Sequence, residues 1–330
     1  MIKKSTLQIF TFIFALCCIA SSVNAQKPPI HPGIALYREG KFDQAIASLE
    51  QAKTQPGTAT NAEIWNTLGL AYYASDQIEP AKTALEKAIK LDPDSSAFHS
   101  NLGYVYLLLR RIGDARNVTN KAIRLNPRNT NAYFTLGRVS LWEGDLDEAE
   151  KNAIKIGEIN GALPEGYILR SQILMRRLGQ RVYMGWDIID EIDLIKQAVN
   201  VLGTGIERCR AHPNLVDLTE EYRSLSALLK FVTEQGDRSG EAVSAPIQVN
   251  AKLRPKYNAA KLRGAEGTAQ IAALIGSDGK VKYAFILDGL GYGLDEQSIE
   301  AVKQLKFEPA MVSGKVSDSV RTIEYHVRLY

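Results

Sequence analysis

A pattern that recurs every 34 residues constrains the fold of this chain more than any other feature of its sequence. The repeated residues are a leucine–glycine pair, at Leu68-Gly69, Leu102-Gly103 and Leu136-Gly137, and an alanine, at Ala81, Ala115 and Ala149. A fixed period of roughly 20–50 residues is typical of arrays of stacked units, because one such unit cannot bury its apolar face alone. The sequence therefore predicts a solenoid over a large part of the chain.

Spacing within one unit predicts two helices that pack closely against each other. Residues three, four and seven positions apart share a helical face. The residues that do so are Trp65, Leu68 and Tyr72 in the first helix and Ala81, Leu85 and Ala88 in the second. Gly69 and Ala81 are small where the two axes must approach, and Pro93 ends the second helix because it has no N–H to donate.

Seven positions of this unit match the consensus of a known repeat, namely Trp65, Leu68, Gly69, Tyr72, Ala81, Ala88 and Pro93. This part of the chain resembles the tetratricopeptide repeat family. A weaker unit precedes the three clear ones, which gives about four repeats over residues 26–163 and satisfies the minimum of about three for a stable stack. The resemblance implies an all-helical solenoid in which the first helix of each hairpin lines a concave groove.

Helical patterns continue over residues 164–235, although the 34-residue period is lost there. We predict that these additional helices cap the open end of the stack. Gly203-Thr204-Gly205 is expected to kink or break the second of them, because glycine is unfavourable inside a helix. A polar break at residues 236–246 predicts a linker, so residues 26–235 and 245–330 are expected to fold separately.

The first 25 residues have the composition of a secretory signal. Lys3 and Lys4 precede a 14-residue apolar run at residues 7–20, and Val23-Asn24-Ala25 offers small residues for cleavage. The run is shorter than the roughly 20 residues that a membrane-spanning helix needs. We therefore predict cleavage after Ala25, a mature chain that begins at Gln26 without a membrane span, and a periplasmic location. A retained inner-membrane anchor that faces the periplasm is the alternative.

After the linker, the apolar period changes from that of a helix to that of a strand. Residues 268–275 form a predicted strand, residues 276–279 a hairpin turn, and residues 280–287 a returning strand with Val281, Tyr283, Phe285 and Leu287 on one face. Asp295 is the predicted N-cap of a helix. Residues 320–329 form a final strand, and Ile323, Tyr325, Val327 and Leu329 are expected to face inward. The predicted order is strand, strand, helix, strand.

Six short motifs accompany this order: Pro255-Lys256-Tyr257, Glu266-Gly267, Asp278-Gly279-Lys280-Val281, Gly293-Leu294-Asp295, Phe307-Glu308-Pro309-Ala310 and Gly314-Lys315-Val316. Together they make residues 247–330 similar to the TonB C-terminal domain family. The predicted fold class is thus an all-helical tetratricopeptide repeat solenoid followed by a small TonB-like α+β domain. The resemblance implies that the final strand lies at the edge of a sheet and accepts an extended peptide from an outer-membrane receptor.

The sequence offers no constellation of residues that would support catalysis or hold a cofactor. Its histidines, His31, His99, His212 and His326, are scattered. Cys209 and His212 have the spacing of two metal ligands, but a zinc site needs three or four. The net charge is only +3 and no run of basic residues occurs, so nothing favours nucleic acid as a partner. We predict neither an enzyme nor a metal or cofactor; an uncharacterised enzyme is the alternative from another class.

Two candidate binding surfaces follow from the two resemblances. The groove positions of the repeats correspond here to Asn66, Leu70, Tyr73, Ser100, Tyr104, Leu107, Phe134, Arg138 and Leu141. Aromatic and apolar side chains with one cation suit an extended peptide or a helix, whereas Leu107 and Leu141 are explained equally well by packing between hairpins. The second surface is the final strand, whose outward residues are Thr322, Glu324, His326 and Arg328.

These features predict a periplasmic adaptor of a Gram-negative bacterium. Its repeats are expected to bind a protein or peptide, and its TonB-like domain to engage a second partner such as a TonB-dependent outer-membrane transporter. A membrane-anchored TonB paralogue that energises outer-membrane transport is the main alternative.

Overall fold

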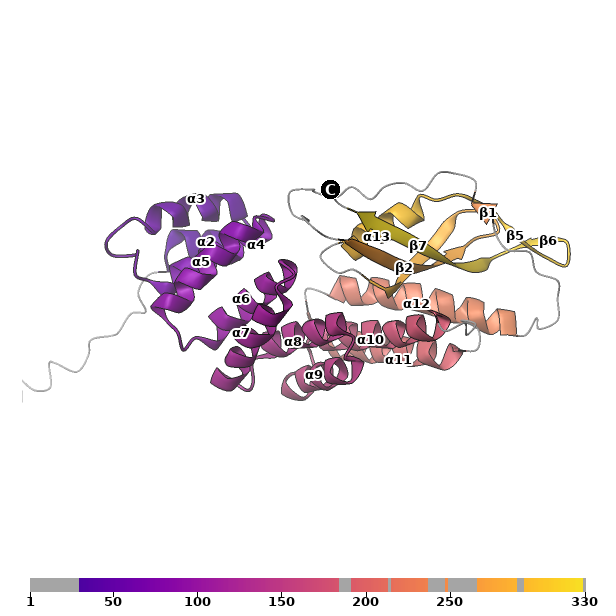
Figure 1. Cartoon of the computed structure of the whole chain (residues 1–330), viewed down its shortest axis with the longest axis horizontal. Coiled ribbons are helices and arrows are strands. Elements are labelled where there is room, and N and C mark those ends of the chain that lie inside the picture. Colours follow the sequence, from indigo (N-terminus) through magenta and orange to yellow (C-terminus); the bar gives the residue numbers. More distant parts are fainter. Residues whose placement is uncertain are drawn as a thin grey trace, which may run out of the picture.

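The computed structural model describes residues 30–183, 191–212, 215–236, 247–248, 266–289 and 294–328. In this part of the chain, an array of helices leads into a small strand-rich domain, as the sequence predicts (Figure 1). Residues 1–25, where the signal is predicted, lie outside the described residues. So do residues 237–246 of the predicted linker and the motif Pro255-Lys256-Tyr257.

Four helical hairpins occupy residues 30–163. Their helices are α2 (Pro32–Arg38) with α3 (Phe42–Ala52), α4 (Ala62–Ala74) with α5 (Ile78–Leu91), α6 (Ser96–Leu108) with α7 (Ile112–Leu125), and α8 (Thr130–Glu143) with α9 (Leu146–Ile159). Asn61, Ser95 and Asn129, which are 34 residues apart, cap α4, α6 and α8 by accepting a hydrogen bond from a backbone N–H. The caps show why each first helix begins at the same phase of the repeat.

The repeated small residues lie where the two helices of a hairpin approach each other. A Cβ added at Gly69 would lie 2.6 Å from Cγ of Leu85, and one added at Gly103 would collide with Oγ1 of Thr119. Ala81 and Ala115 are completely buried. The 34-residue pattern therefore records close helix crossings, as predicted.

Tyrosine–glutamate hydrogen bonds join successive hairpins. The Tyr72 hydroxyl on α4 donates to Glu50 on α3 over 2.7 Å, and the Tyr106 hydroxyl on α6 donates to Glu86 on α5 over 2.9 Å. Burial, and then the neighbouring carboxylate, raises the pKa of Tyr72 to about 12 and likewise that of Tyr106 to about 12. These phenols stay protonated near neutral pH and remain hydrogen-bond donors.

Three longer helices follow the hairpins: α10 (Pro164–Tyr183), α11 (Ile192–Arg208) and α12 (Leu215–Gly236). The predicted break at residues 203–205 is wrong, because α11 continues through them. Gly205 instead allows close packing, since a Cβ there would lie 2.7 Å from Cγ of Tyr167. Tertiary contact thus outweighs the low intrinsic helix propensity of glycine at this position.

The C-terminal domain has the predicted order of strand, strand, helix and strand. Strands β2 (Glu266–Ile275), β3 (Val281–Asp288) and β7 (Ser319–Arg328) form an antiparallel sheet with the order β3-β2-β7. Short pairs are formed by β1 (Ile247–Gln248) with β4 (Phe307–Glu308), and by β5 (Ala310–Val312) with β6 (Lys315–Ser317). Helix α13 (Leu294–Lys303) begins one residue before the predicted N-cap Asp295.

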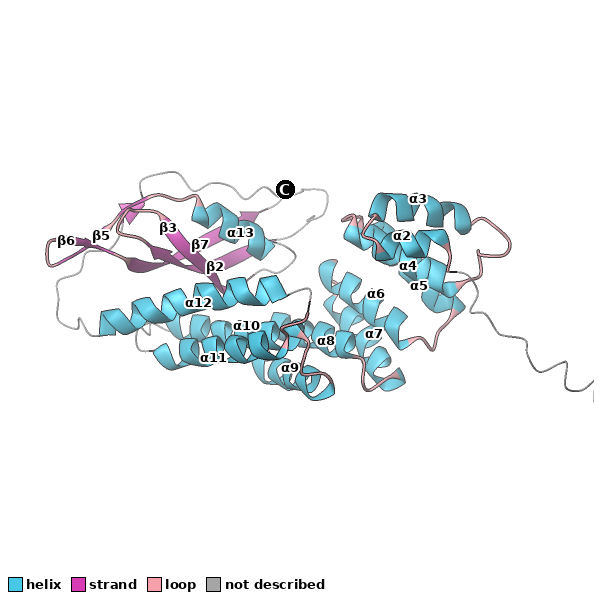
Figure 2. Ribbon diagram, turned by 180° about the vertical axis from the view of Figure 1, so that it is seen from behind, coloured by secondary structure: helices cyan, strands magenta, loops and turns pink. Residues whose placement is uncertain are grey.

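Both faces of the central strand β2 are buried. One face, which includes Ile271 and Ile275, packs with Val302 of α13, and the other, which includes Ala272 and Leu274, packs with α10, α11 and α12. Figure 2 shows α13 and α12 on opposite sides of the sheet. Val281 lies on the α13 face, not with Tyr283, Phe285 and Leu287 as predicted, because the register shifts between Leu274 and Ile275.

The helices and the sheet share one apolar core. Phe285 and Leu287 of β3 join Leu178 of α10 and Leu225 of α12 in a single buried cluster. A Cβ added at Gly179 would lie 2.5 Å from the carbonyl oxygen of Leu287, so α10 touches the backbone of β3. The two units are therefore packed together, and whether residues 26–235 and 245–330 can fold separately stays a prediction. The boundary at residues 236–246 stays a prediction.

Candidate protein-binding cleft

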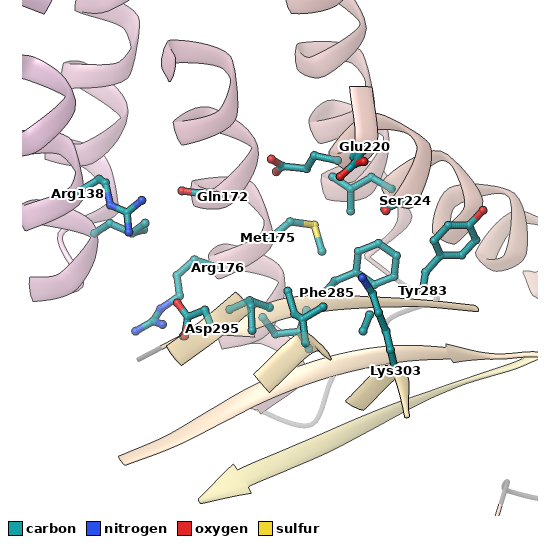
Figure 3. A pocket seen from close by; sticks show the side chains of 18 of the residues that line it. Arg138, Gln172, Met175, Arg176, Glu220, Ser224, Tyr283, Phe285, Asp295 and Lys303 are labelled. Atoms are coloured by element: carbon teal, nitrogen blue, oxygen red, sulfur yellow. The ribbon is translucent and has the colours of Figure 1, made fainter. Parts of the chain in front are cut away.

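A cleft of about 980 Å³ lies where the helical array meets the C-terminal domain. We call it the interdomain cleft. Four walls surround it: the first helices of the later repeats, α10, α12, and β3 with α13 (Figure 3). The lining residues include Tyr104, Leu107, Arg138, Leu141, Trp142, Gln172, Met175, Arg176, Glu220, Glu221, Arg223, Ser224, Leu225, Asp295, Ile299, Lys303 and residues 282–287 of β3. A cavity of this volume is at the upper end of the usual range for binding pockets.

The repeat wall of the cleft carries four of the predicted groove residues, namely Tyr104, Leu107, Arg138 and Leu141. The ring of Tyr104 packs edge-on against that of Tyr73, with the centroids 5.6 Å apart. The guanidinium of Arg138 lies over the ring of Phe134 at 5.9 Å. Residues from α4, α6 and α8 thus form one aromatic and cationic surface that leads into the cleft.

Other predicted groove residues lie outside the lining of the cleft: Asn66, Leu70, Tyr73, Ser100 and Phe134. Asn66 is 9% exposed and accepts a hydrogen bond from Asn101, and Ser100 is 2% exposed and donates to the carbonyl of Ala97. Asn66 thus takes part in the contact between α4 and α6, and Ser100 is bonded within its own helix, α6. Whether the predicted groove residues bind a partner stays a prediction.

Sequence reasoning missed the side chains that α10, α12 and β3 contribute to the cleft. They include Gln172, Arg176, Glu220, Arg223 and Lys282. None belongs to the 34-residue pattern, and the cleft exists only because two segments far apart in the sequence pack together. Glu220 and Arg223, which are three residues apart on α12 and exposed, are the local signal of an open surface there.

Most cations of the cleft are neutralised by a neighbouring carboxylate. Arg176 pairs with Asp288, Lys282 with Asp318 at 2.7 Å, and Lys303 with Glu300 at 2.7 Å. Burial raises the pKa of Asp288 above its ordinary value, although its Arg176 partner opposes that effect. The Arg176–Asp288 pair joins α10 to the end of β3, so it holds the two sides of the cleft together.

Glu221 is a half-buried acid in the lining of the cleft. Its carboxyl accepts a hydrogen bond of 2.6 Å from the hydroxyl of Ser171 on α10. Burial raises the pKa of Glu221 to about 7, and the hydrogen bond from Ser171 opposes that rise only in part. The contact between α10 and α12 therefore contains an ionisable group whose charge changes near neutral pH.

The predicted second surface, β7, is at the opposite edge of the sheet from β3. Thr322, Glu324 and His326 are exposed, and Ile323 and Tyr325 are 4% exposed in the core. His326 is 2.7 Å from the hydroxyl of Thr268 on β2 and 3.8 Å from Glu324. The backbone of Arg328 pairs with that of Glu266, and the side chain of Arg328 lies outside the described residues.

Metal and membrane features were searched within the described ranges. These ranges contain no group of three or more His, Cys, Asp or Glu side chains placed to hold a metal ion. Cys209 is 1% exposed, in the apolar cluster of α10, α11 and α12. Among the described helices, none combines the length and the apolar character that crossing a bilayer requires.

Comparisons with known proteins agree with both parts of this fold. Residues 36–102 match the family model of the tetratricopeptide repeat, and residues 254–327 match that of the Gram-negative bacterial TonB protein C-terminal domain. The chloroplastic tetratricopeptide repeat domain-containing protein PYG7 of Arabidopsis thaliana is 39% identical over 64 residues, 19% of this chain. The chain spans only about a fifth (20%) of the length of that curated relative.

Several solved structures resemble the helical part. A protein of Thermus thermophilus, TTC0263, is 21% identical, and the match covers 62% of this chain and 100% of that one with a TM-score of 0.46. MamA is 24% identical, with 53% and 93% covered and a TM-score of 0.40. YrrB, described as having an unusual peptide-binding site, is 19% identical, with 57% and 88% covered and a TM-score of 0.38.

The fold and the cleft define a helical-repeat protein that carries a small α+β domain. It is a tetratricopeptide repeat protein with a C-terminal domain that resembles the TonB C-terminal family. Domains of both kinds indicate a role in protein–protein interaction.

Proposed function

We propose that this protein is a periplasmic adaptor that binds one partner in the interdomain cleft and a second at the β7 edge of its sheet. The observation that carries the proposal is the meeting of two binding elements at one place. The repeat surface with Tyr104 and Arg138 faces strand β3 of the C-terminal domain across a cavity of about 980 Å³. A partner in this cleft would contact both domains at once.

The composition of the cleft supports binding of a protein segment. Tyr104, Trp142 and Phe285 supply aromatic surface, and Arg138 supplies a cation on the same wall as two of them. Aromatic residues and arginine are enriched where proteins bind one another, because they bury a large area at a small entropic cost. We therefore propose that these residues bind a partner protein.

The second surface is supported by the position of β7 in the sheet. β7 is an edge strand in the order β3-β2-β7, and its exposed residues Thr322, Glu324 and His326 are polar. Backbone groups at an edge strand can pair with an added strand, and polar side chains limit aggregation there. We propose a TonB-dependent outer-membrane transporter as the second partner.

Site-specific crosslinking in the envelope of a Gram-negative host tests both surfaces. A photoreactive phenylalanine analogue is placed at Tyr104, at Thr322 or, as a control, at Ile154, which is 44% exposed on α9 and outside the cleft. We expect Tyr104 and Thr322 to capture different proteins and Ile154 to capture neither. Capture of the same proteins from all three positions, or of none from the first two, would refute the adaptor role.

The location is tested separately by fractionation and N-terminal sequencing of the exported protein. The proposal predicts a periplasmic chain that begins at Gln26. Met1 retained on an inner-membrane protein would instead support the anchored TonB paralogue.

A further inference from the structure

The interdomain cleft runs along the edge of β3 and not across one of its faces. Six consecutive residues, 282–287, line it. Successive side chains of a strand point to opposite faces of the sheet, so a cavity on one face would touch only every second residue. Tyr283, Phe285 and Leu287 pack on the α10–α12 face, and Ala284 and Ile286 on the α13 face. Only the edge of the strand is next to all six.

The edge of β3 lies in a slot with a wall on each side. Within the described part of the chain, β3 pairs with β2 alone along its ladder. Met175 and Leu225 line the cleft from the helices on one face of the sheet, and Ile299 and Lys303 line it from α13 on the other. Six residues in a strand extend over about 20 Å. The slot therefore has the length and the shape of one extended segment.

We infer that the interdomain cleft binds an extended segment of a partner protein, which adds to the sheet beside β3 and places a carboxylate on Arg138. This inference rests on the proposed function and specifies its first partner. Main-chain hydrogen bonds to the edge of β3 hold the segment, because an edge strand presents N–H and C=O groups that an added strand satisfies. Alternate side chains of the segment face Met175 and Leu225, so apolar residues fit there.

Arg138 is the reason that we infer a carboxylate on the partner segment. Its side chain is half-buried in the cleft wall, and the structure gives it the ring of Phe134 as a neighbour, with no carboxylate within 4 Å among the described residues. Two arginines of the neighbouring helices differ, since Arg116 of α7 pairs with Glu143 and Glu148, and Arg177 of α10 pairs with Glu150. A partner carboxylate would form charge-assisted hydrogen bonds with a guanidinium already held in place.

The charges on the two sides of the cleft set the direction of the segment. Glu220 is exposed on α12, and Figure 3 shows its carboxylate and the guanidinium of Arg138 on opposite sides of the cleft. Arg223 is exposed on the same α12 wall and offsets the charge of Glu220, so a carboxylate is attracted more strongly to Arg138 than to the α12 side. The acidic residue of the partner therefore lies at the end of the segment that is next to α8.

Hydrogen exchange of the purified mature chain, read by NMR or by mass spectrometry at residue resolution, tests this placement. Successive N–H groups of a strand point to opposite sides, so every second amide in residues 283–287 should exchange quickly in the free protein. The probe is a pool of eight-residue peptides in which Val, Ile, Tyr or Phe alternates with Ser or Thr. One set carries a single Glu, and a matched set carries Gln at that position.

We expect the Glu set to bind and to protect the fast amides of β3. Arg138→Gln should lower the affinity for the Glu set about tenfold or more, because a hydrogen bond between charged groups is lost. The affinity for the Gln set should be unchanged. Arg128→Gln removes an exposed arginine outside the cleft and should change neither set.

Three results would overturn the inference. In the first, the peptides protect amides of β7 in place of those of β3. In the second, Arg138→Gln weakens binding of both peptide sets equally, and in the third neither set binds. The adaptor role would survive each of these results if Tyr104 still crosslinks to a partner in the envelope. It fails only through the crosslinking results described above, so the two failures are distinguishable.

Discussion

At the scale of single residues, the environment of a side chain is the property that is hardest to predict from the sequence. Glu221 belongs to a run of charged residues on α12 and would be expected to face solvent. The fold instead places its carboxyl against Ser171, where it is partly withdrawn from solvent. An uncharged carboxyl is favoured in such a place because desolvation penalises the ionised form.

Glu221→Gln should change how the stability of the protein depends on pH. Because the pKa of Glu221 is about 7 in the folded protein and 4.5 ordinarily, the folded state binds the extra proton between those values. Its stabilising contribution is thus complete below pH 4.5 and is lost as the pH rises through 7.

The free energy of unfolding of the wild type should therefore fall relative to that of Glu221→Gln by up to about 3 kcal/mol between pH 4.5 and pH 8. Urea titrations across this range would measure the difference. Glu220→Gln, which removes an exposed carboxyl from the same turn, controls for the change in net charge. Parallel stability curves for wild type and Glu221→Gln would mean that the carboxyl is solvated.

Ala115 and Gly113 give a matched test of the repeat phase. Ala115 is completely buried at the crossing of α6 and α7, whereas a Cβ at Gly113 would meet open space. Ala115→Leu should cost about 1–3 kcal/mol through overpacking. Gly113→Ala, two residues away on α7, should stabilise by up to about 1 kcal/mol because alanine favours the helix. Chemical denaturation measures both, and an unchanged midpoint for Ala115→Leu would contradict the assigned crossing.

At the scale of elements, most of the fold follows from local patterns. The repeat helices are predictable because Asn61, Ser95 and Asn129 cap them at the same phase and glycines fix their crossings. The strands follow from alternation. The two wrong predictions share one cause, namely contacts with residues distant in the sequence. Gly205 packs against Tyr167 within a continuous helix, and a bulge in the ladder with β2 moves Val281 to the other face of the sheet.

The edge of β7 can be tested with proline at adjacent positions. Arg321 and Thr322 pair with Ala273 and Ala272 of β2, and their N–H groups point to opposite sides of β7. Proline has no N–H, so one of Arg321→Pro and Thr322→Pro should break the ladder and cost about 1–3 kcal/mol. The other should fold normally but lose the partner captured from Thr322, as measured by pull-down from envelope extract. If the folded variant retains that partner, strand addition at β7 is wrong.

At the scale of the whole molecule, the cleft depends on the contact between α10 and β3. Only the repeat wall of the candidate site follows from the sequence, because Tyr104 and Arg138 occupy groove positions of the repeat. The other walls do not, because Met175, Arg223 and the edge of β3 come together only when the sheet packs on α10 and α12. No local periodicity encodes how two units on either side of a linker dock. The shared apolar cluster predicts that they unfold as one cooperative unit.

A single added methyl group at Gly179 is expected to disturb the packing of α10 against β3. A Cβ there would lie 2.5 Å from the carbonyl oxygen of Leu287, so Gly179→Ala forces α10 and β3 apart. We expect it to lower the free energy of unfolding by about 1–3 kcal/mol, although alanine is the better helix former. Gly157→Ala on α9, where a Cβ meets nothing, should raise it by up to about 1 kcal/mol.

Hydrogen exchange separates a loss of docking from general damage. In Gly179→Ala, the amides of β3 and of α10 should lose protection, while those of α4 and α5, several hairpins away, should keep it. Binding of the Glu peptide set should weaken in parallel, because the slot is no longer held at its proper width. If Gly179→Ala stabilises the protein as Gly157→Ala does, α10 and β3 are not in contact in solution and the interdomain cleft does not form.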